Sequence, residues 1–370
     1  MIIKMGRKLV TIQKIHSLTE IPEKDLIETG KVNDWNVIVK QREEKGDDPY
    51  FKNGDLCVFF EIDSVLPDKP EFEFLRSKKF RIKTMKMSGM ISEGLVLPLS
   101  ILPKSVKIKE GLDVTEILGV TKFEKYIPAQ NKIQKPVTFK DFIKQKLGIN
   151  QKFPKWIKKT DEERIQNCFN RLQHKKDLVV SEKLDGCSAT YAIKQHKFLF
   201  LKFYSYYICS RTQVREAKKD NVWGEVFINY KMKEKLKRLF KELKPKNSLV
   251  VQGEIIGEGI QGNKYKKTSF PEFYAFNLVV DRVAIYPYEV LKKAGIPLVP
   301  CINPKNSILE ETQATVEDIL GSSEGKSKIN EKTEREGLVW RHYTRDDTGK
   351  LVQDQSFKSI SRKFLMMHDE

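Results

Sequence analysis

The chain has 370 residues, of which 39% are hydrophobic and 10% aromatic, so it is long enough for two or three domains with buried cores. Its formal net charge of +18 favours polyanionic partners, most often nucleic acid, although a lysine-rich surface without such a partner gives the same count. The five cysteines are widely spaced with no C-x-x-C pair, which argues against a disulfide framework or zinc site and for a reducing compartment.

The first segment, "MIIKMGRKLVTIQKIHSL", has lysines within every apolar stretch, so we do not expect a signal peptide. No apolar run of the chain is long enough to span a membrane. We therefore expect a cytoplasmic or nuclear protein without a membrane partner, and the sequence carries no signal for a dimer, so we expect a monomer.

Residues 1–120 are expected to be mostly β-structure. The short β-rich runs "WNVIVK", "GDLCVFFEI", "KFRIKTMKM" and "EGLVLPL" are separated by turn sequences such as "KNGD" and "PDKP". Several short strands in about 120 residues favour a small OB-like barrel, with a β-sandwich as the alternative.

Residues 121–159 are rich in lysine, proline and polar residues, and we interpret them as a basic linker with one short helix at "TFKDFIKQKL". The segment "TDEERIQNCFNRLQHKK" then predicts a helix at the start of a second domain, residues 160–370. Thr160 is its candidate N-cap and Glu163 would complete a capping box. On this helix Arg164 and Gln166 would lie on a solvated face or reach the functional site.

The rest of the second domain mixes strands and helices. Strands are predicted at "LVVSEKLDG", "ATYAIK", "KFLFLKF", "SLVVQGEIIG", "FYAFNLVV", "EGLVWRHY" and "QSFKSI". Helices are predicted at "FINYKMKEKLKRLFKELK", "YEVLKKAG" and "TVEDILG". This order predicts an α+β fold with antiparallel sheets. No G-x-G-x-x-G or P-loop sequence is present, so Rossmann and Walker chemistry lose support.

Several predicted strands of the second domain carry charged residues at or near their ends. Buried charges are costly unless they are paired or bound to a ligand. Charges of both signs on neighbouring strands predict a site for phosphates together with a divalent cation. The residues concerned are Arg211, Glu254, Glu336 and Lys358.

Lys183 lies in the predicted turn of "DLVVSEKLDGCSATYAIK", next to Glu182, Asp185 and Gly186. A solvated turn is one interpretation and a lysine nucleophile is the other. A nucleophilic lysine needs a lowered pKa, which burial, a metal or neighbouring cations provide. Because the two carboxylates oppose that shift, the nucleophile hypothesis predicts a metal that occupies them.

"EKLDG" resembles the K-x-D-G motif of polynucleotide ligases and mRNA capping enzymes. The later motifs of that superfamily follow in order, from "CSRT" through "QGEIIGEGIQGNKY", "EFYAFNL" and "EGLVWR" to "SFKSIS". The resemblance covers nearly all of residues 160–370 and implies an ATP-grasp-like ligase domain. "EGLV" also occurs at Glu93, but only Glu336 lies in the right place in the order.

The N-terminal part of the chain narrows the resemblance to one family. "GDLCVFFEIDSVLP" and "SEGLVLPLS" resemble the N-terminal OB domain of the fifth RNA ligase family. The resemblance implies an ATP-dependent RNA ligase that seals 3′-OH/5′-phosphate breaks, with nicked duplexes as the expected substrate, through lysyl-AMP and RNA-adenylate intermediates. ATP and Mg²⁺ or Mn²⁺ would be its cofactors.

The resemblance also implies a role for each motif residue. Lys183 would carry AMP, and Lys358 and Arg211 would contact phosphate during catalysis. The nucleotide would further contact Glu182 and Phe276, with Phe273 the other candidate for stacking on adenine. The metal would be held through its water shell by Asp185, Glu254 and Glu336. Glu254 would alternatively hold the ribose hydroxyls, and Glu254 and Glu336 are both candidates for contact with the nucleotide.

The last motif departs from the K-x-K of related ligases, because Ile360 stands where the second lysine is expected. Lys350 or Lys363 would supply the missing charge, or Lys358 would act alone. DNA ligases and GTP-using capping enzymes share the other motifs but carry an OB domain after the last one, where this chain has only about ten residues. The remaining alternative is a catalytically silent RNA-binding or RNA-end-sensing protein.

Overall fold

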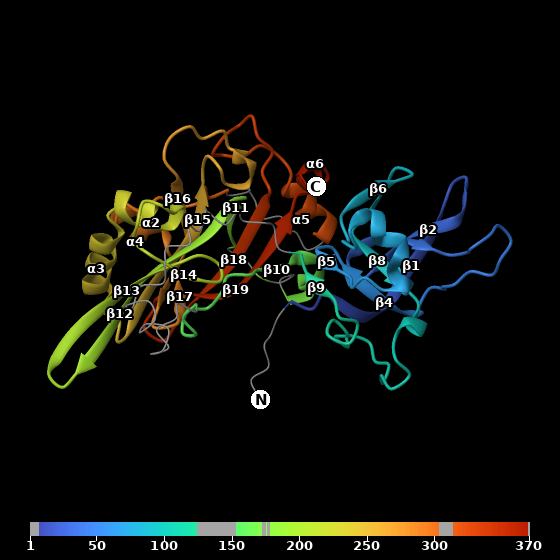
Figure 1. Ribbon diagram of the computed structural model, residues 1–370, viewed down its shortest axis with the longest axis horizontal. Coiled ribbons are helices and arrows are strands. Elements are labelled where there is room, and N and C mark those ends of the chain that lie inside the picture. The colour runs from blue at the N-terminus through green and yellow to red at the C-terminus, as the bar shows by residue number, and fades with distance from the viewer. Residues whose placement is uncertain (1–6, 124–152, 172–174, 176–177, 303–313, 369–370) are drawn as a thin grey trace, which may run out of the picture. The chain divides into compact units, whose positions relative to one another are not determined.

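The computed structural model describes residues 7–123, 153–171, 175, 178–302 and 314–368. The chain divides into two compact units (Figure 1). The first comprises Met1–Lys125, Glu163–Asn170 and Arg362–Glu370, and the second comprises Tyr126–Glu162 and Arg171–Ser361. The predicted boundaries assign the two short segments of the first unit to the second domain instead.

An antiparallel sheet with the order β3-β2-β1-β4-β8 forms the first unit. Its strands are β1 (Val10–Ile21), β2 (Lys24–Val32), β3 (Trp35–Lys40), β4 (Leu56–Glu61) and β8 (Gly94–Leu97). The two edges approach each other, because the Glu93 amide donates to the Asn36 carbonyl at 2.7 Å and the Ile38 amide to Ser92 Oγ at 3.0 Å. The sheet is therefore almost closed, which confirms the predicted barrel.

Strands β1 and β2 are absent from the predicted set, although β1 pairs with both β2 and β4 at the centre of the sheet. Interspersed polar residues hide a face that buries Val10, Ile12 and Ile15. Of the predicted strand "KFRIKTMKM", only Met85–Met87 (β6) is a strand, and Lys79 begins the segment in a left-handed conformation with φ 54°.

The first unit also contains several short elements around this barrel. These are β5 (Ser64–Val65) paired with β9 (Thr121–Lys122), β6 paired with β7 (Met90–Ser92), the 3-10 helices η1 (Pro70–Lys78) and η2 (Leu99–Ile101), β10 (Glu163–Arg164), η3 (Ile165–Asn167) and α6 (Arg362–His368). A further 3-10 turn, η4, spans Phe169–Arg171.

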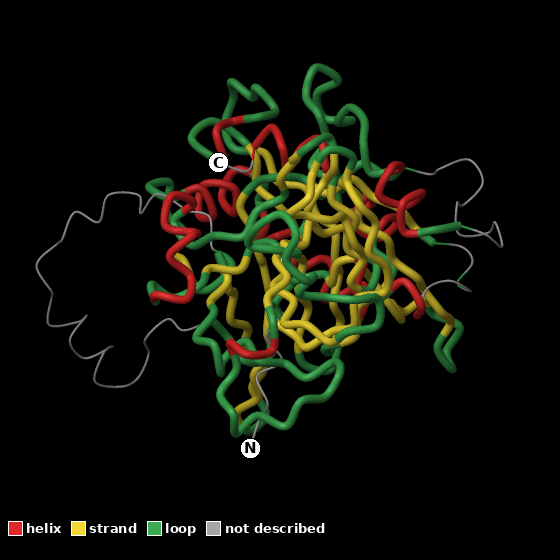
Figure 2. Tube along the Cα trace, turned by 90° about the vertical axis from the view of Figure 1, so that its right-hand side faces the viewer, coloured by secondary structure: helices red, strands yellow, loops and turns green. Residues whose placement is uncertain are grey.

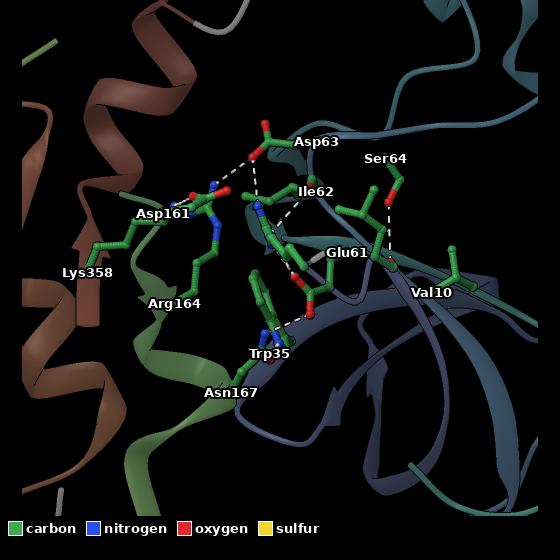
Figure 3. Close-up of polar contacts among 12 residues, drawn as sticks. Val10, Trp35, Glu61, Ile62, Asp63, Ser64, Asp161, Arg164, Asn167 and Lys358 are labelled. Carbon is green, nitrogen blue, oxygen red and sulfur yellow. Dashed lines mark hydrogen bonds and ion pairs between the residues drawn. The ribbon is translucent and has the colours of Figure 1, made fainter. Parts of the chain in front are cut away.

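The helix predicted from Thr160 is wrong. The chain there is extended at Glu163–Arg164 and then forms the short 3-10 turns η3 and η4. Tertiary contacts outweigh the capping pattern, because Arg164 pairs with Asp63 at 3.1 Å and Asn167 accepts a hydrogen bond from Trp35 Nε1 at 2.7 Å (Figure 3). Arg164 and Gln166 are buried, so they do not lie on a solvated helix face.

The second unit is built on a large antiparallel sheet with the order β11-β18-β19-β17-β16-β15-β12-β13-β14. Its strands are β11 (Val179–Lys183), β12 (Cys187–Phe198), β13 (Leu201–Cys209), β14 (Val214–Arg215), β15 (Ser248–Ile256), β16 (Glu272–Val280), β17 (Val283–Ile285), β18 (Gly337–Arg345) and β19 (Leu351–Ile360). The predicted α+β fold with antiparallel sheets is confirmed.

Short helices accompany this sheet (Figure 2). They are α2 (Val222–Asn229), α3 (Met232–Leu243), α4 (Tyr288–Lys293) and α5 (Val316–Ser322), together with the 3-10 turn η5 (Gln261–Asn263). The single helix predicted for residues 227–244 is broken, since Lys231 is left-handed with φ 49°. The apolar face of α3 packs on β12 and β15, so the helices cover one face of the sheet and leave the other available for a site.

None of the described helices has the length and apolar character needed to cross a membrane. Most of the predicted basic linker, including its short helix at 138–147, lies outside the described residues.

Candidate active site

Lys183 is the last residue of β11, and a short turn through Asp185 and Gly186 leads into β12. The two strands do not form a hairpin, because β11 pairs with β18 whereas β12 pairs with β13 and β15. A β-carbon on Gly186 would lie 2.2 Å from the carbonyl oxygen of Ile255. Glycine therefore lets the turn approach β15 closely, and this approach brings the turn next to Glu254.

The Lys183 ammonium group forms an ion pair with Glu336, with Nζ 2.6 Å from Oε1. Strand pairing explains the contact, since Lys183 is opposite Gly337, the residue after Glu336. Burial lowers the pKa of Lys183, but the charge and hydrogen bond of Glu336, together with Glu254 and Asp185, outweigh burial and raise that pKa. These carboxylates therefore favour the charged form of Lys183, which is not the form that attacks as a nucleophile.

Glu254 lies near the end of β15, between apolar neighbours on both sides. Burial raises the pKa of its carboxyl group to about 8; the charge of Lys183 opposes this shift, and the negative charges of Glu336 and Asp185 add to it. The structure thus brings the three predicted metal-binding carboxylates close enough for their charges to interact.

Asp185 is held by two residues that the motif comparison did not single out. Its carboxylate forms an ion pair with Lys264, and its backbone amide donates a hydrogen bond to the Tyr265 hydroxyl oxygen at 2.8 Å. Both partners belong to "GNKY", directly after the 3-10 turn η5. A positive charge thus already lies against this carboxylate, where the motif resemblance places a metal.

Asp161 contacts both of the predicted phosphate-binding cations. Its Oδ1 lies 3.2 Å from Lys358 Nζ (Figure 3), and its Oδ2 lies 3.4 Å from Arg211 Nη2. Lys358 is largely buried on β19, whereas Arg211 follows β13 and is more exposed. A carboxylate therefore lies between two cations that could otherwise hold an anionic ligand such as phosphate.

The carboxylates fit a divalent cation held through water. Within the described ranges, no group of three or more His, Cys, Asp or Glu side chains is arranged to hold a metal ion directly. Glu336 Oε2 is nevertheless buried without a hydrogen-bond partner, and the pKa of Glu254 is raised first by burial and then by the negative charges of Glu336 and Asp185. A hydrated Mg²⁺ or Mn²⁺ would satisfy both features, since such ions keep several waters.

The aromatic residues of β16 lie on opposite faces of the sheet. Phe273 is fully buried in the core against Tyr191, with ring centroids 5.1 Å apart, so it offers no surface to a ligand. Phe276 is half-buried, and the Arg341 guanidinium lies 5.5 Å from the centre of its ring. Of the two candidates for adenine stacking, only Phe276 has an accessible surface.

Glu182 is buried, and its Oε2 accepts a hydrogen bond from the Lys328 amide at 2.8 Å. Burial raises the pKa of its carboxyl group, against the opposing hydrogen bonds from Ser327 and Lys328. Its Oε1 is buried without a hydrogen-bond partner. This oxygen remains available for a ligand group that donates a hydrogen bond.

The position of the missing second lysine is apolar, because Ile360 is buried. Lys350 directly precedes β19 and lies eight residues before Lys358. At about 3.3 Å per residue, the two lysines are roughly 26 Å apart along the strand. Lys363 belongs to the other compact unit. The cations that the structure does place in the second unit beside motif residues are Lys264, against Asp185, and Arg341, over Phe276.

Sequence reasoning therefore missed four residues at this site: Asp161, Lys264, Tyr265 and Arg341. Asp161 was assigned to the first turn of a helix that does not form. The position of "GNKY" directly after the "GEIIGEGIQ" segment was the only available signal for Lys264 and Tyr265.

Comparisons with known proteins agree with this geometry. The sequence matches a family of OB-fold domains over residues 9–99 and the RNA ligase family over residues 176–360. A search of curated protein sequences finds no match. Among solved structures, the chain is similar to an alanine variant of Naegleria gruberi RNA ligase in the apo form, with 30% identity, 99% of each chain covered and a TM-score of 0.77.

This chain is also similar to two ligand-bound forms of the same Naegleria gruberi enzyme. A second alanine variant with ATP and Mn matches with 30% identity and a TM-score of 0.76, over 98% of this chain and 99% of that chain. The enzyme with pyrophosphate gives the same identity, coverage and TM-score.

Proposed function

Because this chain belongs to the RNA ligase family, we propose that it joins RNA 3′-OH and 5′-phosphate ends, with a nicked duplex as its substrate. It is an ATP-dependent RNA ligase, similar over its full length to an enzyme solved with ATP, AMP and pyrophosphate. The observation that carries the proposal is a half-buried lysine, Lys183, whose charge interacts with those of three carboxylates, while Arg211 lies close enough to Glu254 for their charges to interact.

In the first step, Lys183 Nζ attacks the α-phosphorus of ATP, the bond to the β-phosphate breaks, and pyrophosphate leaves with AMP held on the lysine. A divalent metal, when bound among Asp185, Glu254 and Glu336, supplies positive charge at the phosphates. Once the charges of Glu336, Glu254 and Asp185 are compensated, burial favours the neutral amine of Lys183 and lowers its pKa, so that the amine can lose its proton before attack.

The cationic residues act on the phosphates in this proposal. Lys358 and Arg211 exchange Asp161 for phosphate oxygens, and Lys358 stabilises the charge that develops on the α-phosphate. Phe276 stacks on adenine and Glu182 accepts a hydrogen bond from the nucleotide through Oε1. AMP then passes to the RNA 5′-phosphate, and the 3′-OH displaces it to form the new bond.

Several finer expectations belong to the same proposal. We propose that the OB barrel grips the strand beside the break, that the protein acts as a monomer, and that it works in the cytoplasm or nucleus. Binding through lysine and arginine contacts to phosphates should weaken steeply with salt.

Covalent labelling tests the proposal. The protein is mixed with α-labelled ATP and Mg²⁺ or Mn²⁺ and run on a denaturing gel beside Lys183→Ala and Lys237→Ala, a control at an exposed lysine of α3. We expect a labelled band with the wild type and the control, none with Lys183→Ala, and none with labelled GTP. A folded wild type that binds RNA but takes no label would support the silent RNA-binding alternative instead.

A further inference from the structure

The hairpin of β12 and β13 is longer than the rest of the sheet requires. The two strands stay paired from Thr190 opposite Cys209 to Phe198 opposite Leu201, and Leu199 and Phe200 form a two-residue turn between them. Partners on β15 accompany β12 only as far as Lys194. The last part of the hairpin therefore projects beyond its neighbours, as Figure 1 shows.

The end of this hairpin is apolar and exposed. Leu199 is 82% exposed, Phe200 99% and Leu201 71%. Phe203 and Tyr204 continue the apolar surface along β13 and are also exposed. A contiguous group of large apolar side chains is costly in water, and such groups commonly mark interaction sites.

The turn itself does not call for these residues. Two-residue hairpin turns favour Asn-Gly and similar pairs, because they need positive φ angles. Leu199 adopts φ 51° here, an unfavourable conformation for a leucine. Since neither the backbone geometry nor solvation favours Leu-Phe at this position, a binding role is the remaining physical reason for it.

The charges beside the tip indicate an anionic partner. Lys197 and Lys202 lie directly opposite each other and are exposed, and neither forms an ion pair with another residue of the described chain. Like charges at paired positions destabilise a hairpin, and a bound anion relieves the repulsion. The tip thus combines apolar surface with uncompensated positive charge.

Aromatic rings also lie near the tip of the hairpin. The rings of His196 and Phe203 are stacked, with centroids 5.0 Å apart and an interplanar angle of 10°. Because side chains alternate along a strand, these rings lie on the opposite face of the hairpin from Lys197 and Lys202. Exposed rings on a basic hairpin suit single-stranded nucleic acid, in which bases stack on rings and phosphates pair with cations. A lipid surface would use the apolar tip and the lysines but would make no use of stacked rings.

We propose that this hairpin tip, residues 196–204, is an RNA-binding arm that takes unpaired nucleotides of the substrate, with a base on Phe200 at the turn and phosphates on Lys197 and Lys202. The inference rests on the proposed function for the identity of the polyanion. The arm would contact unpaired nucleotides of the RNA that lie far from the two ends being joined.

The distance along the strand gives the arm a length requirement. Strand β12 runs 12 residues from Cys187, beside the active-site turn, to Phe198, which at about 3.3 Å per residue is roughly 40 Å. A duplex rises about 3.4 Å per base pair, so the arm reaches nucleotides about a dozen positions from the break. Short substrates should therefore be insensitive to changes in the arm.

The test uses the full chain with two variants of the tip. Leu199→Asn/Phe200→Gly removes the apolar tip and installs a favoured turn sequence, so the hairpin should be retained. Lys197→Gln/Lys202→Gln removes the paired charges. Dissociation constants are measured by fluorescence anisotropy for a nicked RNA with single-stranded extensions of about 15 nucleotides and for a nick with arms of about six base pairs, and adenylylation is measured without RNA.

For the long substrate we expect binding about tenfold weaker with Leu199→Asn/Phe200→Gly. With Lys197→Gln/Lys202→Gln, the slope of log affinity against log salt should fall by about 1.4, the value for two phosphate contacts to a single strand. Binding of the short substrate and the rate of adenylylation should not change.

Unchanged affinity of both variants for the long RNA, with normal adenylylation, would overturn the inference and leave the proposed function intact. Loss of binding to vesicles containing phosphatidylserine, with unchanged RNA binding, would overturn it in favour of a membrane surface. A wild type that cannot be adenylylated would count against the proposed function rather than the arm.

Discussion

Replacing Glu254 with glutamine should stabilise the nucleotide-free protein while removing a residue needed for the reaction. The pKa of the Glu254 carboxyl group is raised from 4.5 to about 8 by burial, against the pull of Lys183. Between these values the native state holds a proton that the unfolded state releases, so stability falls as pH rises through this window. Glutamine resembles the protonated form and avoids that loss.

The magnitude follows from the width of the window. Each pKa unit corresponds to about 1.4 kcal/mol, so a shift of about 3.5 units sets a ceiling of roughly 5 kcal/mol. Glu254 is only half-buried by its accessible surface, so solvent screens part of the effect. We therefore expect Glu254→Gln to be more stable by about 1–3 kcal/mol at pH 8, with almost no difference at pH 5.

Urea unfolding followed by tryptophan fluorescence, at several pH values from 5 to 9 with a metal chelator, measures the difference. Glu258→Gln, at an exposed position two residues after β15, is the matched control and should show no pH-dependent gap. Above pH 7, adding Mn²⁺ should stabilise the wild type more than it stabilises Glu254→Gln. A gap that does not change with pH, or a less stable variant at pH 8, would refute the reasoning.

Two further substitutions probe the contacts around the lysine. Asp161→Asn should lower the KM for ATP about two- to fivefold, because the charge competing with phosphate for its two cationic partners is removed; a raised KM in adenylylation assays would mean that Asp161 positions those cations instead. Gly186→Ala should abolish adenylylation and cost about 1–3 kcal/mol of stability, since its β-carbon would lie 2.2 Å from the Ile255 carbonyl oxygen. Gly321→Ala in α5, where nothing lies within 4 Å, should change neither the label nor the melting temperature.

A comparison of the predicted and observed elements shows how much secondary structure the local sequence determines. Alternating and continuous apolar runs predicted nearly every strand of the second unit, including β11, β15 and β18, because a buried sheet face imposes its period on the residues. The same reasoning missed β1, whose apolar residues are interspersed with polar ones, and predicted one helix where Lys231 breaks α2 from α3. Local sequence records which face is buried but not which partner covers it.

The order of short motifs from Lys183 to Lys358, by itself, determined the superfamily and named the candidates for the residues that carry its chemistry. Those residues are separated by up to 175 positions, and their meaning depends on order and chemical type, which a sequence contains in full. The basic composition likewise favoured a polyanionic partner.

Only the tertiary structure decided the state of these residues. The pairing of β11 with β18 sets Lys183 against Glu336 and so raises its pKa, and packing of β16 leaves Phe276 rather than Phe273 accessible. Asp161 meets Arg211 and Lys358 because the predicted helix does not form. The physical reason is that charge interactions depend on distances across strands, and those distances are set by pairing and packing that span the whole chain.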